Sequence, residues 1–179
     1  MNERDFIKLL RLYQHDLMNH LQIIHGYLSM GYQDKVNVKV NDLLSCFEKE
    51  RTLMETNAPN FIIWLLQVNH LENNIRVNYC FEQTYGKINL ISIDDQVTLH
   101  CKQFIECIKL IGSVSELYEI TIKFSVDRDN SSVIHMNFQI SEQLDRQTFL
   151  AHLPTFQTER LVHLEQTVDG LNCNMTYFT

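Results

Sequence analysis

Apolar residues recur along the first thirty positions with the period of an α-helix. At about 100° per residue they fall on one stripe, which we expect to be a buried seam. The stripe consists of Phe6, Leu10, Tyr13, Leu17, Leu21, Ile24 and Leu28. The pattern predicts a helix from about Asp5 to Met30, ended by Gly31.

A second helix is predicted from Asp34 to about Thr56, with apolar steps of three, four and seven residues. Its stripe is Val36, Val40, Leu43, Phe47 and Met54.

Two such helices form an antiparallel hairpin that cannot cover its own apolar face in water. Two solutions are open from the residues alone. The hairpin either packs against the rest of its own chain or pairs with a second copy to make a four-helix bundle.

The clearest break in the chain follows the second helix, at Asn57-Ala58-Pro59-Asn60, where we expect one helix to stop and Asn60 to cap the next. The predicted domains are therefore residues 1–57 and 58–179. The second is predicted to be α/β with a largely antiparallel sheet. Its expected helices are 61–72, 94–111 (capped by Asp94 or Asp95) and 146–152, and its expected strands are 76–83, 119–126, 133–140, 160–167 and 172–178.

Composition is that of an ordinary globular protein, with 179 residues, 45% hydrophobic and 21% charged. The formal net charge is −7 and no run of Lys or Arg stands out, which argues against nucleic acid or an anionic membrane as partner. No apolar run approaches about 18 residues and no signal peptide is evident, so we expect a cytoplasmic protein. Five scattered cysteines without Cys-x-x-Cys spacing fit small core residues in a reducing compartment.

His15 lies about 160° from the middle of the apolar stripe of the first helix, so its ring should face water. Asn19 and Gln22 lie beside it, one and two turns further along. A free imidazole is largely neutral at neutral pH and nucleophilic at one nitrogen. Position alone does not decide between a functional histidine and the polar face of any amphipathic helix.

The segment His15-Asp16-Leu17-Met18-Asn19-His20-Leu21-Gln22 resembles the phosphoacceptor box of the sporulation-initiation phosphotransferases of endospore formers (family B), which are related to citrate- and malate-type sensor histidine kinases. The chain departs from this box at Gln14, where a basic residue is usual, and at His20, where lysine is common. The resemblance implies an α+β fold, with a helical hairpin that dimerises into a four-helix bundle and an α/β domain similar to a degenerate histidine-kinase ATPase domain.

A nucleotide site in such a domain needs an asparagine-rich helix and glycine-rich loops. Residues 104–109 of the corresponding helix contain no asparagine, and no two of the five glycines lie closer than five residues. We therefore expect no ATP binding and no autophosphorylation.

The resemblance implies a phosphorelay phosphotransferase. It would move a phosphoryl group from the aspartate of one response-regulator receiver to His15, and on to a second receiver that controls sporulation. Asp16 would orient the ring or accept a proton, and the expected receiver-binding residues are Lys8, Arg11, Asn19, Gln22 and Gly26. No metal or cofactor is expected on this chain, because Mg²⁺ would come with the receiver. The alternatives are a non-catalytic dimeric scaffold that binds receivers and a sensor-type histidine kinase.

Overall fold

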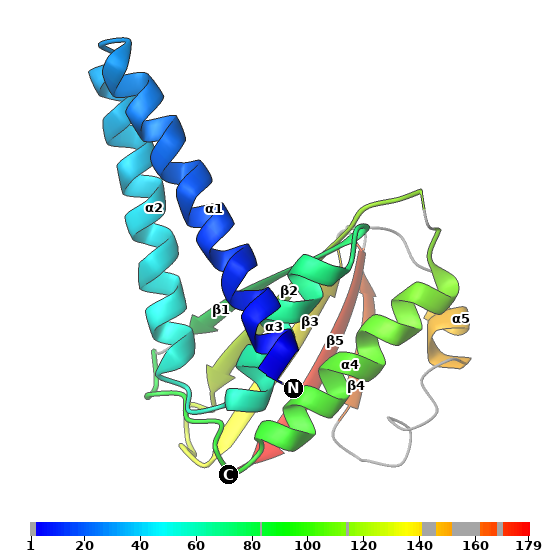
Figure 1. Cartoon of the computed structure of the whole chain (residues 1–179). Coiled ribbons are helices and arrows are strands. Elements are labelled where there is room, and N and C mark those ends of the chain that lie inside the picture. Colours follow the sequence, from blue (N-terminus) through cyan, green and yellow to red (C-terminus); the bar gives the residue numbers. More distant parts are fainter. Residues whose placement is uncertain (1–2, 83, 114, 141–145, 152–161, 168–169) are drawn as a thin grey trace. The chain divides into compact units, whose positions relative to one another are not determined.

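The computed structural model describes residues 3–82, 84–113, 115–140, 146–151, 162–167 and 170–179 (Figure 1). The chain divides into two compact units, Met1–Glu55 and Thr56–Thr179. This division lies two residues before the boundary predicted at 57/58. The order of elements, two long helices followed by an α/β domain, is the one expected from the sequence.

The first unit is a hairpin of two helices, α1 (Glu3–Ser29) and α2 (Gln33–Met54). Gly31 ends α1 as predicted, with a φ of 75° that suits glycine. The N–H of Tyr32 donates to the carbonyl of Tyr27 (2.9 Å), and the N–H of Gly31 donates to that of Leu28 (3.1 Å). This pair of hydrogen bonds is a Schellman motif, which satisfies the last carbonyls of α1 and reverses the chain into α2.

The predicted seam of the hairpin is not buried within one chain. Five of its seven α1 residues are more than a third exposed, from 38% for Tyr13 to 57% for Leu28, and Leu17 and Ile24 are half-buried. The half-buried residues of α1 include Leu9 and His20, which lie beside the predicted stripe. The face that α1 turns to α2 is thus rotated from the expected one, and much of the apolar stripe remains open.

The second unit is a one-sided α/β domain. Its helices are α3 (Pro59–Leu71), α4 (Asp94–Ile111) and α5 (Arg146–Ala151). Its strands are β1 (Ile75–Glu82), β2 (Tyr118–Val126), β3 (Val133–Ile140), β4 (Val162–Thr167) and β5 (Gly170–Phe178). They form a five-stranded sheet in the order β1-β2-β3-β5-β4, parallel only between β1 and β2. The predicted largely antiparallel sheet is confirmed.

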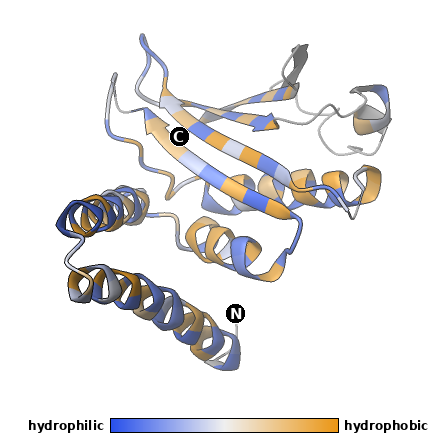
Figure 2. Cartoon of the chain, turned by 90° about the horizontal axis from the view of Figure 1, so that it is seen from above, coloured by the Kyte–Doolittle hydropathy of each residue, from blue (hydrophilic) through white to orange (hydrophobic). Residues whose placement is uncertain are grey.

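The helices α3 and α4 lie on one face of this sheet, and the strands alternate between apolar and polar residues (Figure 2). An aromatic core fills the layer between helices and sheet. Phe104 of α4 stacks on Phe138 of β3 (4.1 Å between ring centroids) and meets Phe149 edge-on. Phe61 of α3 meets Phe124 of β2 edge-on at 5.3 Å. The domain therefore has a complete core of its own.

The capping of α3 and α4 differs from the prediction. Ala58, and not Asn60, is the residue before α3, and Pro59 occupies the first turn. Asp94 does not cap its own helix. Its carboxylate accepts hydrogen bonds from the backbone N–H groups of Asn60 (2.9 Å) and Phe61 (2.8 Å) at the start of α3. A buried carboxylate of α4 thus satisfies the free donors of another helix.

The edge strand β1 is covered at one point by a side chain of α3. The amide of Asn69 accepts a hydrogen bond from the N–H of Val77 and donates one to its carbonyl, both at 2.8 Å. The Asn69 side chain thereby imitates a neighbouring strand at this residue.

The cysteines do not all behave as core residues. Cys101, Cys107 and Cys173 are buried, and burial raises the pKa of the Cys107 thiol to about 11 and that of Cys173 to about 12. Cys46 and Cys80 are exposed, so the expectation was wrong for these two.

Candidate functional site

His15 stands on the outer face of α1, where the amphipathic pattern placed it. The His15 side chain is 69% exposed, and the side chain of Asp16, which it contacts, is 55% exposed. Because α1 continues for two turns and more on either side, the helix backbone fixes the position of the ring.

The two nitrogens of the His15 ring have different surroundings. Nδ1 lies 3.3 Å from Oδ1 of Asp16 and 3.2 Å from Nδ2 of Asn19. With a proton on Nδ1 the ring donates to the Asp16 carboxylate, and the lone pair of the ring is then on Nε2. In this tautomer Nδ1 does not accept from the Asn19 amide, which only packs beside the ring. Nε2 makes no hydrogen bond to any residue in the part of the chain that the structure describes. This tautomer presents a nucleophilic nitrogen to the solvent.

The structure brings two of the predicted site residues, Asp16 and Asn19, into contact with His15. The other four predicted residues share its helix face without touching the ring. At about 100° per residue, these four residues and His15 fall within a sector of about 60°. Lys8, Arg11 and Gln22 are exposed, and Gly26 is half-buried.

Gly26 has open space around it. A Cβ built on this residue would meet nothing within 4 Å, so packing inside the chain does not require glycine here.

Three exposed apolar residues that the sequence analysis did not single out flank the His15 face. Leu12 (39% exposed) and Ile23 (44%) lie on one side of it, and Met18 (52%) lies on the other. The signal was available in the sequence, because these residues are apolar yet lie outside the predicted seam. They give the histidine an apolar border on both sides.

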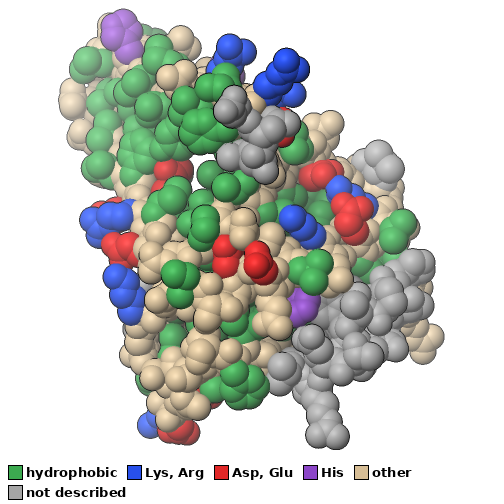
Figure 3. Space-filling view, turned by 60° about the horizontal axis from the view of Figure 1, so that its bottom comes forward, with side chains coloured by type: hydrophobic (Ala, Val, Ile, Leu, Met, Phe, Trp, Pro, Cys, Tyr) green, Lys and Arg blue, Asp and Glu red, His purple; other side chains and the backbone are tan. Residues whose placement is uncertain are grey.

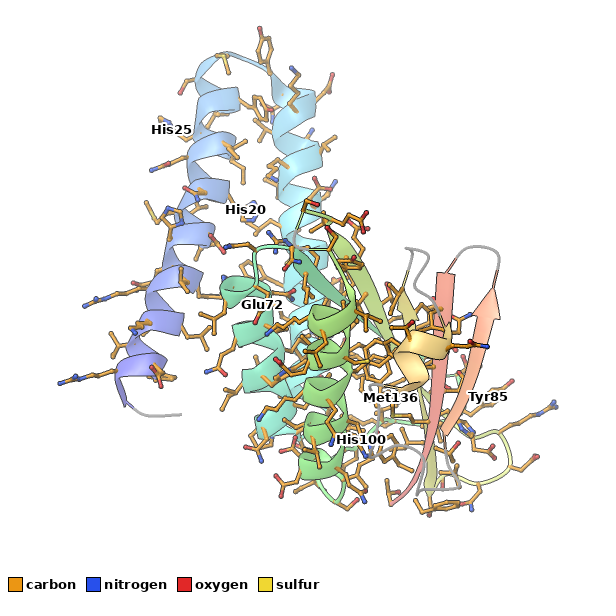
Figure 4. All side chains as sticks on the ribbon, turned by 90° about the vertical axis from the view of Figure 1, so that its right-hand side faces the viewer. His20, His25, Glu72, Tyr85, His100 and Met136 are labelled. Atoms are coloured by element: carbon orange, nitrogen blue, oxygen red, sulfur yellow. The ribbon has the colours of Figure 1, made fainter. Side chains whose placement is uncertain are left out.

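The other histidines of α1 point elsewhere. His20 points toward α2 and His25 points away from it (Figure 4). Among the described residues there is no group of three or more His, Cys, Asp or Glu side chains arranged to hold a metal ion.

Residues 104–109 of α4, the segment that would carry the asparagines of a nucleotide site, contain the charged residues Glu106 and Lys109. The ammonium of Lys109 lies 2.6 Å from a carboxylate oxygen of Glu72 and 2.9 Å from one of Glu106. The two carboxylates engage this cation at the C-terminal ends of α3 and α4.

The chain thus consists of a helical hairpin that carries an exposed histidine, followed by a one-sided α/β domain, as the sequence analysis expected. Residues 1–56 match the family model of the sensor kinase SpoOB-type, alpha-helical domain. The hairpin is therefore similar to the helical domains of SpoOB-type sensor kinases, and the resemblance found in residues 15–22 is confirmed for this part of the chain.

Solved structures of histidine kinases resemble the chain at low sequence identity. A blue-light activated histidine kinase of Erythrobacter litoralis EL346 is 13% identical, with a TM-score of 0.48, over 98% of this chain and 60% of that one. The catalytic domain of histidine kinase ThkA is 10% identical, with a TM-score of 0.43, over 71% of this chain and 92% of that one. The chain thus spans 60% of the length of the light-activated kinase.

No curated protein matches the sequence of this chain. In the described part of the chain, no helix has the length and apolar character needed to cross a bilayer.

Proposed function

We propose that this chain is a phosphorelay phosphotransferase in which His15 takes a phosphoryl group from the aspartate of one receiver domain and passes it to the aspartate of another. The observation that carries the proposal is the exposed ring of His15, with Nδ1 beside the Asp16 carboxylate and Nε2 without a hydrogen-bond partner among the described residues. The hairpin's likeness to SpoOB-type sensor kinases supports it.

The reaction is an in-line displacement at phosphorus. The Nε2 lone pair attacks, the N–P bond forms, and the bond between phosphorus and the acyl oxygen of the receiver aspartate breaks, releasing its carboxylate. The proton on Nδ1 stays there, hydrogen-bonded to Asp16, which stabilises the positive charge that the ring acquires. Attack by a second receiver's aspartate reverses these bonds. Mg²⁺ would enter with the receiver, whose acidic pocket holds it.

Catalysis by this chain would consist of positioning and exclusion of water. Asp16 would orient the ring through its hydrogen bond to Nδ1, and Asn19 would pack beside the ring. The apolar side chains of Leu12, Met18 and Ile23 would pack against a docked receiver and keep water from the acyl phosphate, with Gln22 and Gly26 completing the contact.

We further propose that two copies pair through their hairpins into a four-helix bundle. In one chain the open apolar face includes Leu10, Leu21 and Leu28 of α1 and Leu44 and Phe47 of α2, each at least 36% exposed. In the space-filling view, hydrophobic side chains gather on the hairpin, in the upper part of the picture (Figure 3). On α1 this face lies about 140° from His15 around the helix, so pairing leaves the histidine accessible.

We propose that the α/β domain does not use ATP, so the phosphoryl group comes from a protein. Residues 104–109 offer no asparagine, and Lys109 is already engaged by two carboxylates.

The test is to mix the purified protein with a receiver labelled on its aspartate. Acid-labile, base-stable label should appear on the wild type and on His25→Ala, a matched change of an exposed histidine on the same helix. It should be absent from His15→Ala with unchanged helix content. Receiver binding without transfer would favour the scaffold, and labelling by ATP alone would favour a kinase; either result contradicts the proposal.

A further inference from the structure

Three basic residues precede His15 on its own face of α1. Arg4, Lys8 and Arg11 stand eleven, seven and four residues before the histidine, and all three are exposed. At about 100° per residue, the three residues lie within about 40° of His15 around the helix. At a rise of about 1.5 Å per residue, Arg4 lies about 16 Å from His15 along the helix axis. We call Arg4, Lys8 and Arg11 the basic strip. Arg4 is the member that the sequence analysis did not consider.

Arg4 lies in the first turn of α1, where the partial positive charge of the helix N-terminus disfavours a cation. Arg4 and Lys8 are also like charges four residues apart, which repel each other on a helix surface. None of the three has a hydrogen bond or ion pair with another residue in the described ranges. Lys109 and Arg51, by contrast, pair with carboxylates on neighbouring turns. The strip therefore does not serve the stability of its own helix.

The strip is also one-sided. Beyond His15 the same face continues with the neutral residues Asn19, Gln22 and Gly26. The whole chain carries a formal charge of −7, so the strip is a local cluster of positive charge on an acidic protein.

We infer that the basic strip docks carboxylates on the receiver that lie to one side of its phosphorylated aspartate. This inference rests on the proposed function and adds to it the charge of the partner surface and its direction along α1. An acidic receiver would otherwise be repelled by an acidic protein. Exposed charge pairs contribute little affinity individually, but a row of them steers encounter and fixes orientation.

The experiment compares two triple charge reversals of equal net change. Arg4→Glu/Lys8→Glu/Arg11→Glu removes the strip, and Lys49→Glu/Lys102→Glu/Arg128→Glu changes three exposed basic residues elsewhere. The initial rate of label transfer from the receiver to His15 is measured from low to high salt, with helix content as the check on folding. Arg4→Glu alone isolates the newly assigned residue.

At low salt we expect the strip variant to transfer at least about 10-fold more slowly than the control variant, and Arg4→Glu about 2- to 3-fold more slowly than wild type. The differences should shrink as salt screens the charges. Equal rates for the two triple variants at every salt concentration would overturn the inference while leaving the proposed function intact. So would a loss of binding to vesicles of anionic lipid with transfer unchanged, because the strip would then serve a membrane. If the wild type accepts no label, the proposed function itself fails.

Discussion

The two units of this chain differ in how far each completes its own core. Among the described residues, the hairpin buries only Val36 and Leu53 of its apolar side chains, and it exposes fifteen of the twenty-two large hydrophobic residues that are exposed. The α/β domain holds the other buried apolar residues, with Phe61, Phe104, Phe124 and Phe138 fully enclosed. The α/β domain thus encloses an apolar core of its own, whereas the hairpin leaves most of its apolar side chains uncovered, and these are the side chains that the proposed pairing would cover.

The largest expected effect is on the core of the α/β domain. Phe104→Ala removes a ring that contacts Phe138 and Phe149 and should lower the free energy of unfolding by about 3–5 kcal/mol. Denaturant unfolding measures this. Leu99→Ala, on the same helix but 51% exposed, should change it by less than about 0.5 kcal/mol. Similar losses for both variants would mean that the domain is not packed as described.

The next effect concerns the open face of the hairpin. Leu21 is 45% exposed in one chain and would be covered in the proposed four-helix bundle, so Leu21→Glu places a charge inside the interface. We expect the dimer to weaken at least about 100-fold, or about 2.7 kcal/mol, as measured by sedimentation equilibrium.

The matched change in the other unit is Leu110→Glu, at a residue that is 69% exposed, and it should leave association unchanged. A wild-type protein that stays monomeric at every concentration would remove the basis of the comparison.

A smaller effect is expected at the start of α3. Asp94→Ala removes the acceptor for the N–H groups of Asn60 and Phe61, and should cost the α/β domain about 1–2 kcal/mol in unfolding free energy. Asp95→Ala changes an exposed carboxylate that, among the described residues, accepts a hydrogen bond from the Asn60 side chain alone. It should cost a few tenths of a kcal/mol. An equal cost would contradict the capping role of Asp94.

The smallest effect is a pH dependence confined to the α/β domain. The pKa of Asp127 is lowered from its ordinary value of 3.8 by its hydrogen bond with His135 and by the backbone N–H groups of Asp129 and Asn130. A lowered carboxyl pKa contributes stability that is complete above the ordinary pKa and is lost as the pH falls through the folded one. Asp127→Asn should therefore destabilise slightly near neutral pH and not in strong acid.

Melting temperatures measured from about pH 2 to pH 7 test this effect, because the contribution is lost as the pH falls from the ordinary carboxyl pKa through the lowered one. Asp129→Asn, in the same loop, is the control and should leave the pH profile unchanged. A pH profile for Asp127→Asn parallel to that of the wild type would contradict the prediction.

The local features of the chain could be predicted from the sequence because each depends on neighbouring residues. Gly31 marks the end of α1, the loop at 127–132 joins β2 to β3, and the period of the apolar residues puts His15 on the outside of the helix. Features that depend on distant residues could not be predicted. Asp94 looks like a cap for its own helix, and only the packing of α4 beside α3 turns its carboxylate to Asn60.

The face of α1 that meets α2 could also not be predicted from the pattern of apolar residues. Its apolar stripe is wider than the face that meets α2, so the seam prediction merged residues that contact α2 with residues that remain open. Cys80 is exposed because it shares the face of β1 that carries Arg76, Asn78 and Glu82, which the alternation of the strand could have shown.

The hydrogen bonds from the Asn69 amide of α3 to the edge strand β1 have a consequence for the behaviour of the protein at high concentration. A free strand edge can recruit the same edge of another molecule and begin a growing cross-β assembly. Because the N–H and carbonyl of Val77 are already occupied, an incoming strand meets an interrupted row of partners. The β1 edge is thus protected at Val77 against uncontrolled pairing, while the apolar face of the hairpin stays open.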